Sequence, residues 1–213
     1  MVNGIMVGLA AMLGGGAELP STDRVSQEVD QFKAVYVSTE SNVVRVNQIQ
    51  KNNPSPFLTS ASSRRCSIYI NSNSDSKELW SYLLRHPDVP EKAFTAFAVG
   101  HEMAHCVAAR PGQRYNIRGI FEKEMGVTFT DNHHFEETFG DLLGLAYVKE
   151  RFPQYESAVR EQVKKLREEL AERDPQHDSS PFLKSHWISR AADMVAPASI
   201  TVAEKKSASE EAL

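Results

Sequence analysis

The stretch from residue 94 to residue 108 constrains the fold most strongly, because its apolar side chains recur at steps of three and four residues. This spacing is typical of one buried face of an α-helix. Asp88 is expected to cap the N-terminus of this helix, with Pro90 in the first turn and Glu91 three residues after the cap. The pair Pro111-Gly112 is expected to end it. The segment therefore predicts a long helix that packs into the core.

Two histidines within this predicted face, His101 and His105, enclose Glu102 in an HExxH pentad. Residues four apart on a helix have Cβ atoms about 5–6 Å apart, so both imidazoles can bind one Zn²⁺ at about 2.0–2.1 Å. Glu102 would then flank the metal as the general base that takes a proton from zinc-activated water. The alternative is a pair of core histidines bonded to carbonyl groups, because short motifs also occur by chance. A third ligand is needed to decide.

A second predicted helix, over residues 134–147, offers that ligand. Glu137 and Asp141 are four residues apart on a largely apolar segment, where a carboxylate is costly to bury unless it is paired or bound to metal. Glu137 is expected to bind the zinc, and Asp141 to accept a hydrogen bond from the far nitrogen of a ligand histidine. The alternative is two solvated carboxylates at the helix edge, as expected for Glu136. His133 and His134 are expected to face solvent, with contact to substrate or metal as their alternative.

The HExxH pentad followed by Glu137-x-x-x-Asp141 resembles the gluzincin metallopeptidases, and the second helix is similar to that of the M48 type. Gly140 stands where that family favours Ala, a small-for-small change. The resemblance covers roughly residues 64–153. It implies a minimal zincin-like domain of the α+β class, mostly helical, with a small sheet beside an active-site helix. It also implies one catalytic Zn²⁺ and the activity of a zinc-dependent metalloendopeptidase, with Glu102 as general base. A zinc-bound or inactive zincin-fold protein-interaction module is the alternative.

The resemblance further implies where a peptide or protein substrate binds. Residues 68–71 resemble the edge strand that precedes the active-site helix in these enzymes and lies along the substrate cleft. An extended peptide is expected to pair with this strand through backbone hydrogen bonds. The four substrate-binding residues so predicted are Ile68, Tyr69, Ile70 and Asn71.

A downstream Ser-His pair followed by an arginine resembles an element that lies near the cleft in M48-like enzymes. By this resemblance, His186 and Arg190 are expected to share a helix face and to stabilise the oxyanion formed during hydrolysis. Trp187 replaces the proline that usually follows that histidine. A helix-capping or salt-bridging pair is the alternative for these two residues.

The remaining segments are predicted from periodicity and turn residues. Helices are expected over residues 22–36, 76–84 and 154–173, and a strand over 64–71. In the last of these helices Arg167 and Glu168 are expected among exposed charges. Residues 42–49 fit a strand or a continued helix, residues 117–125 a strand or a short helix, and residues 52–63 a loop.

Composition excludes some classes of function. A chain of 213 residues is long enough for one sizeable core, predicted over residues 21–195. A net charge of −4 without a dense basic run gives no reason to expect nucleic acid as a partner. No apolar run is long enough to cross a bilayer as a helix, so no transmembrane helix is expected. The oligomeric state is left open.

The N-terminus and the two cysteines bear on the cellular compartment. Residues 1–20 are expected to be a signal-like or flexible segment, because they are apolar and Gly-rich but lack a positively charged start. Export to the periplasm or the exterior is therefore favoured over a cytoplasmic location. Cys66 and Cys106 are expected to form a disulfide in an exported protein, or to be two buried thiols otherwise. Residues 196–213 are expected to be a disordered tail.

Overall fold

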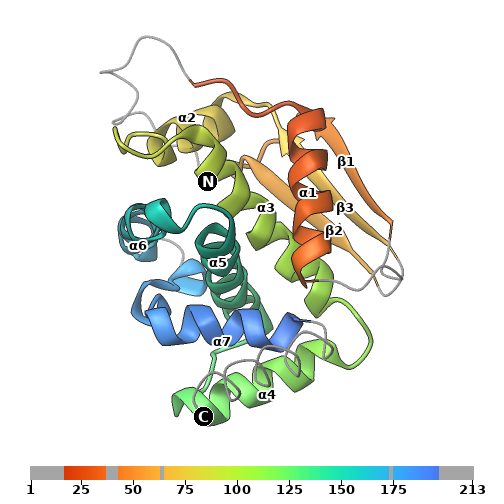
Figure 1. The fold of residues 1–213 in the computed structure, drawn as a ribbon, viewed down its shortest axis with the longest axis vertical. Helices are drawn as coiled ribbons and strands as arrows, with labels where there is room; N and C mark the ends of the chain where they lie inside the picture. The colour runs from red at the N-terminus through yellow and green to blue at the C-terminus, as the bar shows by residue number, and fades with distance from the viewer. Residues whose placement is uncertain (1–16, 37–42, 63–64, 173–174, 197–213) are drawn as a thin grey trace, which may run out of the picture.

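The computed structural model describes residues 17–36, 43–62, 65–172 and 175–196, and within these ranges the chain is mostly helical with one small sheet (Figure 1). The helices are α1 Thr22–Tyr36, α2 Ser74–Leu83, α3 Glu91–Ala108, α4 Gln113–Met125, α5 Asn132–Arg151, α6 Glu156–Ala171 and α7 Ser185–Val195. The strands are β1 Val44–Ile49, β2 Phe57–Ala61 and β3 Cys66–Asn71, and the short 3₁₀ helices are η3 Pro153–Tyr155, η4 Pro175–His177 and η5 Ser180–Phe182. The predicted α+β class is confirmed.

The three strands form a mixed sheet in the order β1-β3-β2. Ile68 of β3 pairs with Val46 of the parallel strand β1 and with Thr59 of the antiparallel strand β2. Because both edges of β3 are occupied, the prediction of an edge strand that pairs with substrate is wrong for the four residues Ile68, Tyr69, Ile70 and Asn71. The side of β2 that faces away from β3 pairs with no other strand among the described residues.

Strand β2 lies inside the segment that was predicted to be a loop, so that prediction is also wrong. Its sequence, Phe57-Leu-Thr-Ser-Ala61, has little β-propensity beyond Phe57 and Thr59, and Pro and Ser residues precede it. The pairing with β3 over five residues supplies the hydrogen bonds that stabilise it. Tertiary pairing therefore overrides the local preference. The segment 42–49, which fitted either a strand or a helix, contains β1.

Helices α3 and α5 pack closely at a pair of glycines, and α3 lies between α5 and the sheet (Figure 1). A Cβ atom built on Gly100 would lie 2.8 Å from the Cα of Gly144, and one built on Gly144 would lie 2.7 Å from the carbonyl oxygen of Phe97. These backbones can approach so closely only because neither residue has a side chain. The crossing places the two helices that carry the HExxH and ExxxD motifs side by side.

The predicted start of α3 needs a correction. The N-cap position is Pro90, in an extended conformation and without a side-chain hydrogen bond, and the helix begins at Glu91. Asp88 is therefore not the cap. Val89 still belongs to the preceding turn, because its N–H donates to the carbonyl oxygen of His86. The helix ends at Ala108, just before the Pro111-Gly112 pair, as predicted.

The other elements cover this central pair. Helix α1 packs on α3, and its predicted apolar face is buried. The segment that fitted a strand or a short helix is the helix α4, and α7 packs on α5.

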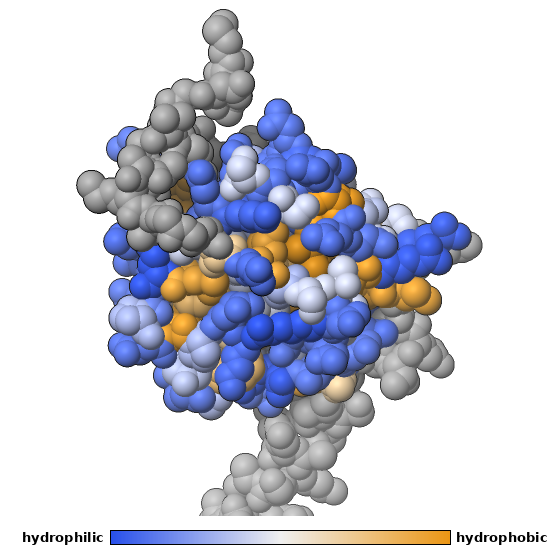
Figure 2. Space-filling model, turned by 90° about the horizontal axis from the view of Figure 1, so that it is seen from above, coloured by the Kyte–Doolittle hydropathy of each residue, from blue (hydrophilic) through white to orange (hydrophobic). Residues whose placement is uncertain are grey.

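A disulfide between Cys66 and Cys106 joins β3 to α3, which is one of the two alternatives left open by the sequence. On the face drawn in Figure 2, hydrophilic side chains surround separate hydrophobic areas.

Within the described ranges, no helix has the length and apolarity that crossing a bilayer requires. The predicted signal-like segment, residues 1–20, and the predicted tail, residues 196–213, lie outside the described residues except for residues 17–20 and 196.

Candidate metal centre

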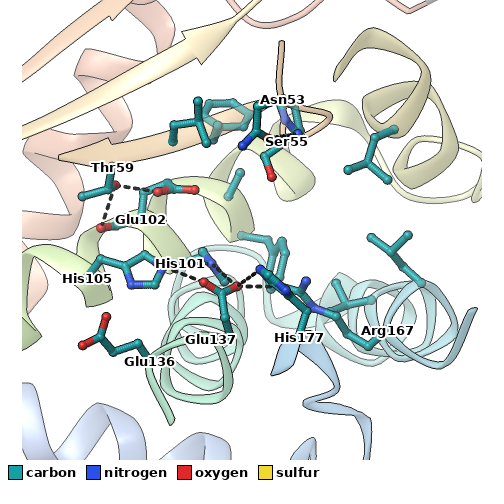
Figure 3. A pocket seen from close by; sticks show the side chains of 18 of the residues that line it. Asn53, Ser55, Thr59, His101, Glu102, His105, Glu136, Glu137, Arg167 and His177 are labelled. Atoms are coloured by element: carbon teal, nitrogen blue, oxygen red, sulfur yellow. Dashed lines mark hydrogen bonds and ion pairs between the residues drawn. The ribbon is translucent and has the colours of Figure 1, made fainter. Parts of the chain in front are cut away.

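Three side chains from α3 and α5 converge on one point (Figure 3). The Nε2 atoms of His101 and His105 are 3.2 Å apart. Glu137 places Oε2 3.5 Å from Nε2 of His101 and Oε1 3.5 Å from Nε2 of His105. Ligands bound tetrahedrally at 2.0–2.1 Å lie about 3.3–3.4 Å from one another. The two nitrogens are close to this spacing, and each lies at a similar distance from one of the two oxygens of Glu137. One ligand atom from each residue lies within 4.8 Å of the other two, so a single ion could bind all three.

Asp141 fixes the orientation of the His101 ring from the side opposite the other two ligands. The ring donates from Nδ1 to Oδ1 of Asp141 at 2.9 Å, which leaves Nε2 facing the other two side chains. Asp141 is fully buried, and it also accepts a hydrogen bond from Ser179 and two from Arg167, at 2.7 and 2.8 Å. Carboxylates that hold metal-binding histidines in one tautomer have this arrangement.

The charges around the three donors favour a cation. Burial alone would lower the pKa of His101, but its contacts with Asp141 and Glu137 outweigh burial and raise that pKa to about 10. Burial and the charge of His101 lower the pKa of His105 to about 4. Burial would raise the pKa of Glu137, yet the two histidines and Arg167 hold it well below its ordinary value. One imidazole is thus protonated beside an ionised carboxylate at neutral pH, and a divalent ion would take the place of that proton.

Glu102 is buried next to this cluster and is held by the sheet. Thr59 of β2 donates its hydroxyl to Oε2 of Glu102 at 2.5 Å, the length of a hydrogen bond to a charged acceptor (Figure 3). Burial raises the pKa of Glu102, while the charge of His101 and the bond from Thr59 oppose that shift. A carboxylate with a raised pKa is suited to accept and return a proton near neutral pH.

These groups line a cavity of about 490 Å³. Its wall includes Phe57, Leu58 and Thr59 of β2. It also includes His101, Glu102 and His105 of α3 and Glu137 of α5. Two further histidines line it, His133 at the start of α5 and His177 in η4. His133 was expected to face solvent, and 48% of its side chain is exposed. It also lines the cavity, so the alternative of contact with substrate or metal stays open.

Sequence reasoning missed two residues of this region. His177 follows the end of α6 in an irregular segment, where no periodicity indicates its direction. Arg167 was predicted among exposed charges, but only 12% of its side chain is exposed. A signal was present for Arg167, because it lies four residues after the buried Val163 and one after the buried Leu166.

The structure does not bring His186 and Arg190 to this site, which corrects the prediction for both. Neither residue lines the cavity. His186 is exposed and its ring contacts Trp187. Arg190 forms two hydrogen bonds with Glu124 of α4, at 2.7 and 2.8 Å. The salt-bridging alternative therefore describes Arg190, and it links α7 to α4.

Gly140 lies against the ring of His101, so replacing it by Ala is expected to weaken metal binding at the candidate site. A Cβ atom at this position would lie 2.8 Å from Cε1 and Nδ1 of His101, and the ring cannot move away because Asp141 holds it. Although Gly and Ala are both small, the ring of His101 thus leaves little room for the added methyl group. We expect Gly140→Ala to lower zinc affinity about 10–100-fold, as other changes beside metal ligands do. Competition titration with a zinc-binding dye measures the affinity.

Gly119→Ala is the matched control, since Gly119 is also inside a helix but has nothing within 4 Å of the added atom. The control should keep its zinc affinity and should be equally stable or more stable, by up to about 1 kcal/mol. Equal zinc affinity in the two variants would show that His101 is not held in the position described.

No protein-family model, curated protein or solved structure matches this chain.

Proposed function

We propose that this protein is a zinc-dependent metalloendopeptidase with a gluzincin-type site in a zincin-like domain. One observation carries the proposal: His101, His105 and Glu137 each place a ligand atom within 4.8 Å of the other two, and Glu102 lies beside them in the same cavity. The donor set, two imidazoles and one carboxylate, is one that catalytic zinc sites use. A purely structural site would not need the adjacent base.

In the proposed reaction Glu102 moves a proton between water and the leaving group. Bound zinc would supply a Lewis acid that polarises the substrate carbonyl and lowers the pKa of water. Glu102 takes the proton from the attacking water and returns it to the amide nitrogen. Its hydrogen bond from Thr59 keeps the carboxylate directed into the cavity. General acid–base help of this kind contributes about 10²–10⁴-fold to the rate.

Strand β2 is the proposed binding edge for an extended peptide. It lines the cavity, its outer side pairs with no described strand, and Thr59 joins it to Glu102. Backbone hydrogen bonds to such an edge give affinity with little sequence discrimination. This role replaces the one predicted for residues 68–71.

His177 is the proposed donor to the oxyanion in place of His186 and Arg190. It lines the cavity on the far side of Glu137, with Nε2 3.5 Å from Oε2 of that carboxylate. A donor at such a position stabilises charge that develops on the carbonyl oxygen. The disulfide between Cys66 and Cys106 supports an exported enzyme, because such bonds persist in oxidising compartments.

Removing the third ligand tests the proposal. We expect the purified protein to carry one zinc by elemental analysis and to cleave casein in a chelator-sensitive way. Glu137→Ala should lose both properties, whereas Glu136→Ala, one residue away and paired with Arg114, should keep its zinc. If Glu137→Ala retains zinc and activity, the ligand set is wrong. Bound zinc in the wild type without turnover would favour a protein-interaction module.

A further inference from the structure

A second group of metal-binding side chains lies on the other side of Glu137. Its members are His133 of α5 and His177 of η4, together with Glu137 itself. Nδ1 of His133 lies 3.9 Å from Oε1 of Glu137, and Nε2 of His177 lies 3.5 Å from Oε2. The two rings are 4.8 Å apart, at an angle of 88°. All three ligand atoms lie within 4.8 Å of one another.

Each oxygen of Glu137 therefore lies near one histidine of the candidate zinc site and one histidine of this second group. Oε1 lies near His105 and His133, and Oε2 lies near His101 and His177. An ionised carboxylate has about four lone-pair sites on its two oxygens. It can thus bind two ions at once, as in two-metal sites whose ions are about 3.5–4 Å apart.

We propose that His133, His177 and Glu137 form a second site for a divalent cation, which shares Glu137 with the proposed catalytic zinc. The inference rests on the proposed function for the first ion and for the hydrolysis that the second ion would slow, but not for the second site itself. Imidazole nitrogens with one carboxylate favour Zn²⁺ over Mg²⁺ or Ca²⁺. The new site is the weaker one, because His133 is half-exposed and must turn toward its partners. The first ion and Arg167, 3.8 Å from Oε2 of Glu137, also repel a second cation.

Filling this site would inhibit hydrolysis. His133 and His177 both line the substrate cavity, so a cation between them occupies space beside the proposed catalytic zinc. It also turns His177 from a hydrogen-bond donor for substrate into a metal ligand. The protein would then be active with one zinc and slowed by zinc in excess. This behaviour makes the second site a sensor of metal concentration.

Calorimetric titration of the metal-free, full-length protein with ZnCl₂ tests the site directly, using protein without a histidine tag. We expect a tight site and a weaker one in the wild type. His133→Ala and His177→Asn, which change two different elements, should each weaken the second site by at least about 100-fold and keep the tight one. His186→Ala is the matched control, because His186 is exposed on α7 and should leave both sites unchanged. Thermal melts of the metal-free variants check that each is folded.

Each outcome decides between the two proposals. The shared site is supported if the wild type shows two zinc-binding sites and each of the variants His133→Ala and His177→Asn shows one. One site in the wild type, or two in either of these variants, overturns it and leaves the proposed function intact. A protein that binds no zinc at all overturns both. Casein cleavage at one equivalent of zinc reports on the proposed function, while a drop of at least about tenfold in excess zinc, absent in His133→Ala, reports on the second site.

Discussion

Glu102→Gln is expected to lower kcat for peptide hydrolysis by about 10²–10⁴-fold and to leave the amount of bound zinc unchanged. The amide has the same shape as the carboxylate and can still accept the hydrogen bond from Thr59, so the cavity should keep its structure. It cannot take a proton from water. Glu102 is not among the three side chains with ligand spacing, so its substitution should not release the metal.

Single-turnover cleavage of a fluorogenic peptide, with zinc content measured on the same samples, gives both quantities. Glu136→Gln is the matched control, because Glu136 lines the same cavity but is paired with Arg114. We expect this control to change kcat by less than about tenfold, since its carboxylate is paired with Arg114 and is not the proposed base. An active Glu102→Gln variant with full zinc content would rule out Glu102 as the base.

The two helices of the site were predictable because their signals are local. Apolar residues at helical spacing predict α3 and α5, and the pairs His101/His105 and Glu137/Asp141 each lie on one helix face. The expectation that the two pairs meet came from chemistry, since a catalytic zinc needs a third ligand. Gly100 and Gly144 explain why they meet so closely, but the clash that each avoids is with the other helix and is visible only in three dimensions.

The strand order of the sheet and the strand that borders the cavity could not be predicted in the same way. Strand order depends on pairing between segments far apart in the chain, and β3 pairs with strands on both sides. Nothing in the residues of β3 distinguishes a central strand from an edge strand of a small sheet. Strand β2, which does border the cavity, lies among Pro, Ser and Asn residues that are typical of a loop, so the sequence did not predict it as a strand. The sequence therefore predicts the edge strand at β3, whereas β2 is the strand that borders the cavity and has a free edge among the described residues.

Arg167 and Arg190 show why charged residues on amphipathic helices are hard to assign. Both lie on surface helices, and the sequence predicted Arg190 near the site and Arg167 in solvent. The structure shows the reverse, because Arg167 reaches the buried Asp141 while Arg190 pairs with Glu124 at the surface. The difference depends on where each helix docks. It does not depend on the helix itself.

Arg167→Leu is accordingly expected to destabilise the metal-free protein by about 3–5 kcal/mol, the range for removing one partner of a buried ion pair. Asp141 is fully buried, and of the partners that the described residues supply it would keep His101 and Ser179. Urea unfolding in the presence of a chelator measures the change without a contribution from bound metal. Arg190→Leu makes the same substitution in an exposed pair, where little stability is expected to be lost.

The pH dependence of the free energy of unfolding shows whether Arg167→Leu loses stability through the ion pair or through packing. Burial would raise the pKa of Asp141, but Arg167 and His101 lower it in the folded protein. The stabilisation is therefore present above the pKa of the unfolded chain and is lost as the pH falls through the lower, folded value. Without Arg167 the pKa of Asp141 in the folded protein rises, and the part of this stabilisation that Arg167 supplies is lost. The stability gap between Arg167→Leu and the wild type should then be largest at neutral pH and narrow in acid, whereas a gap independent of pH would indicate a loss of packing alone.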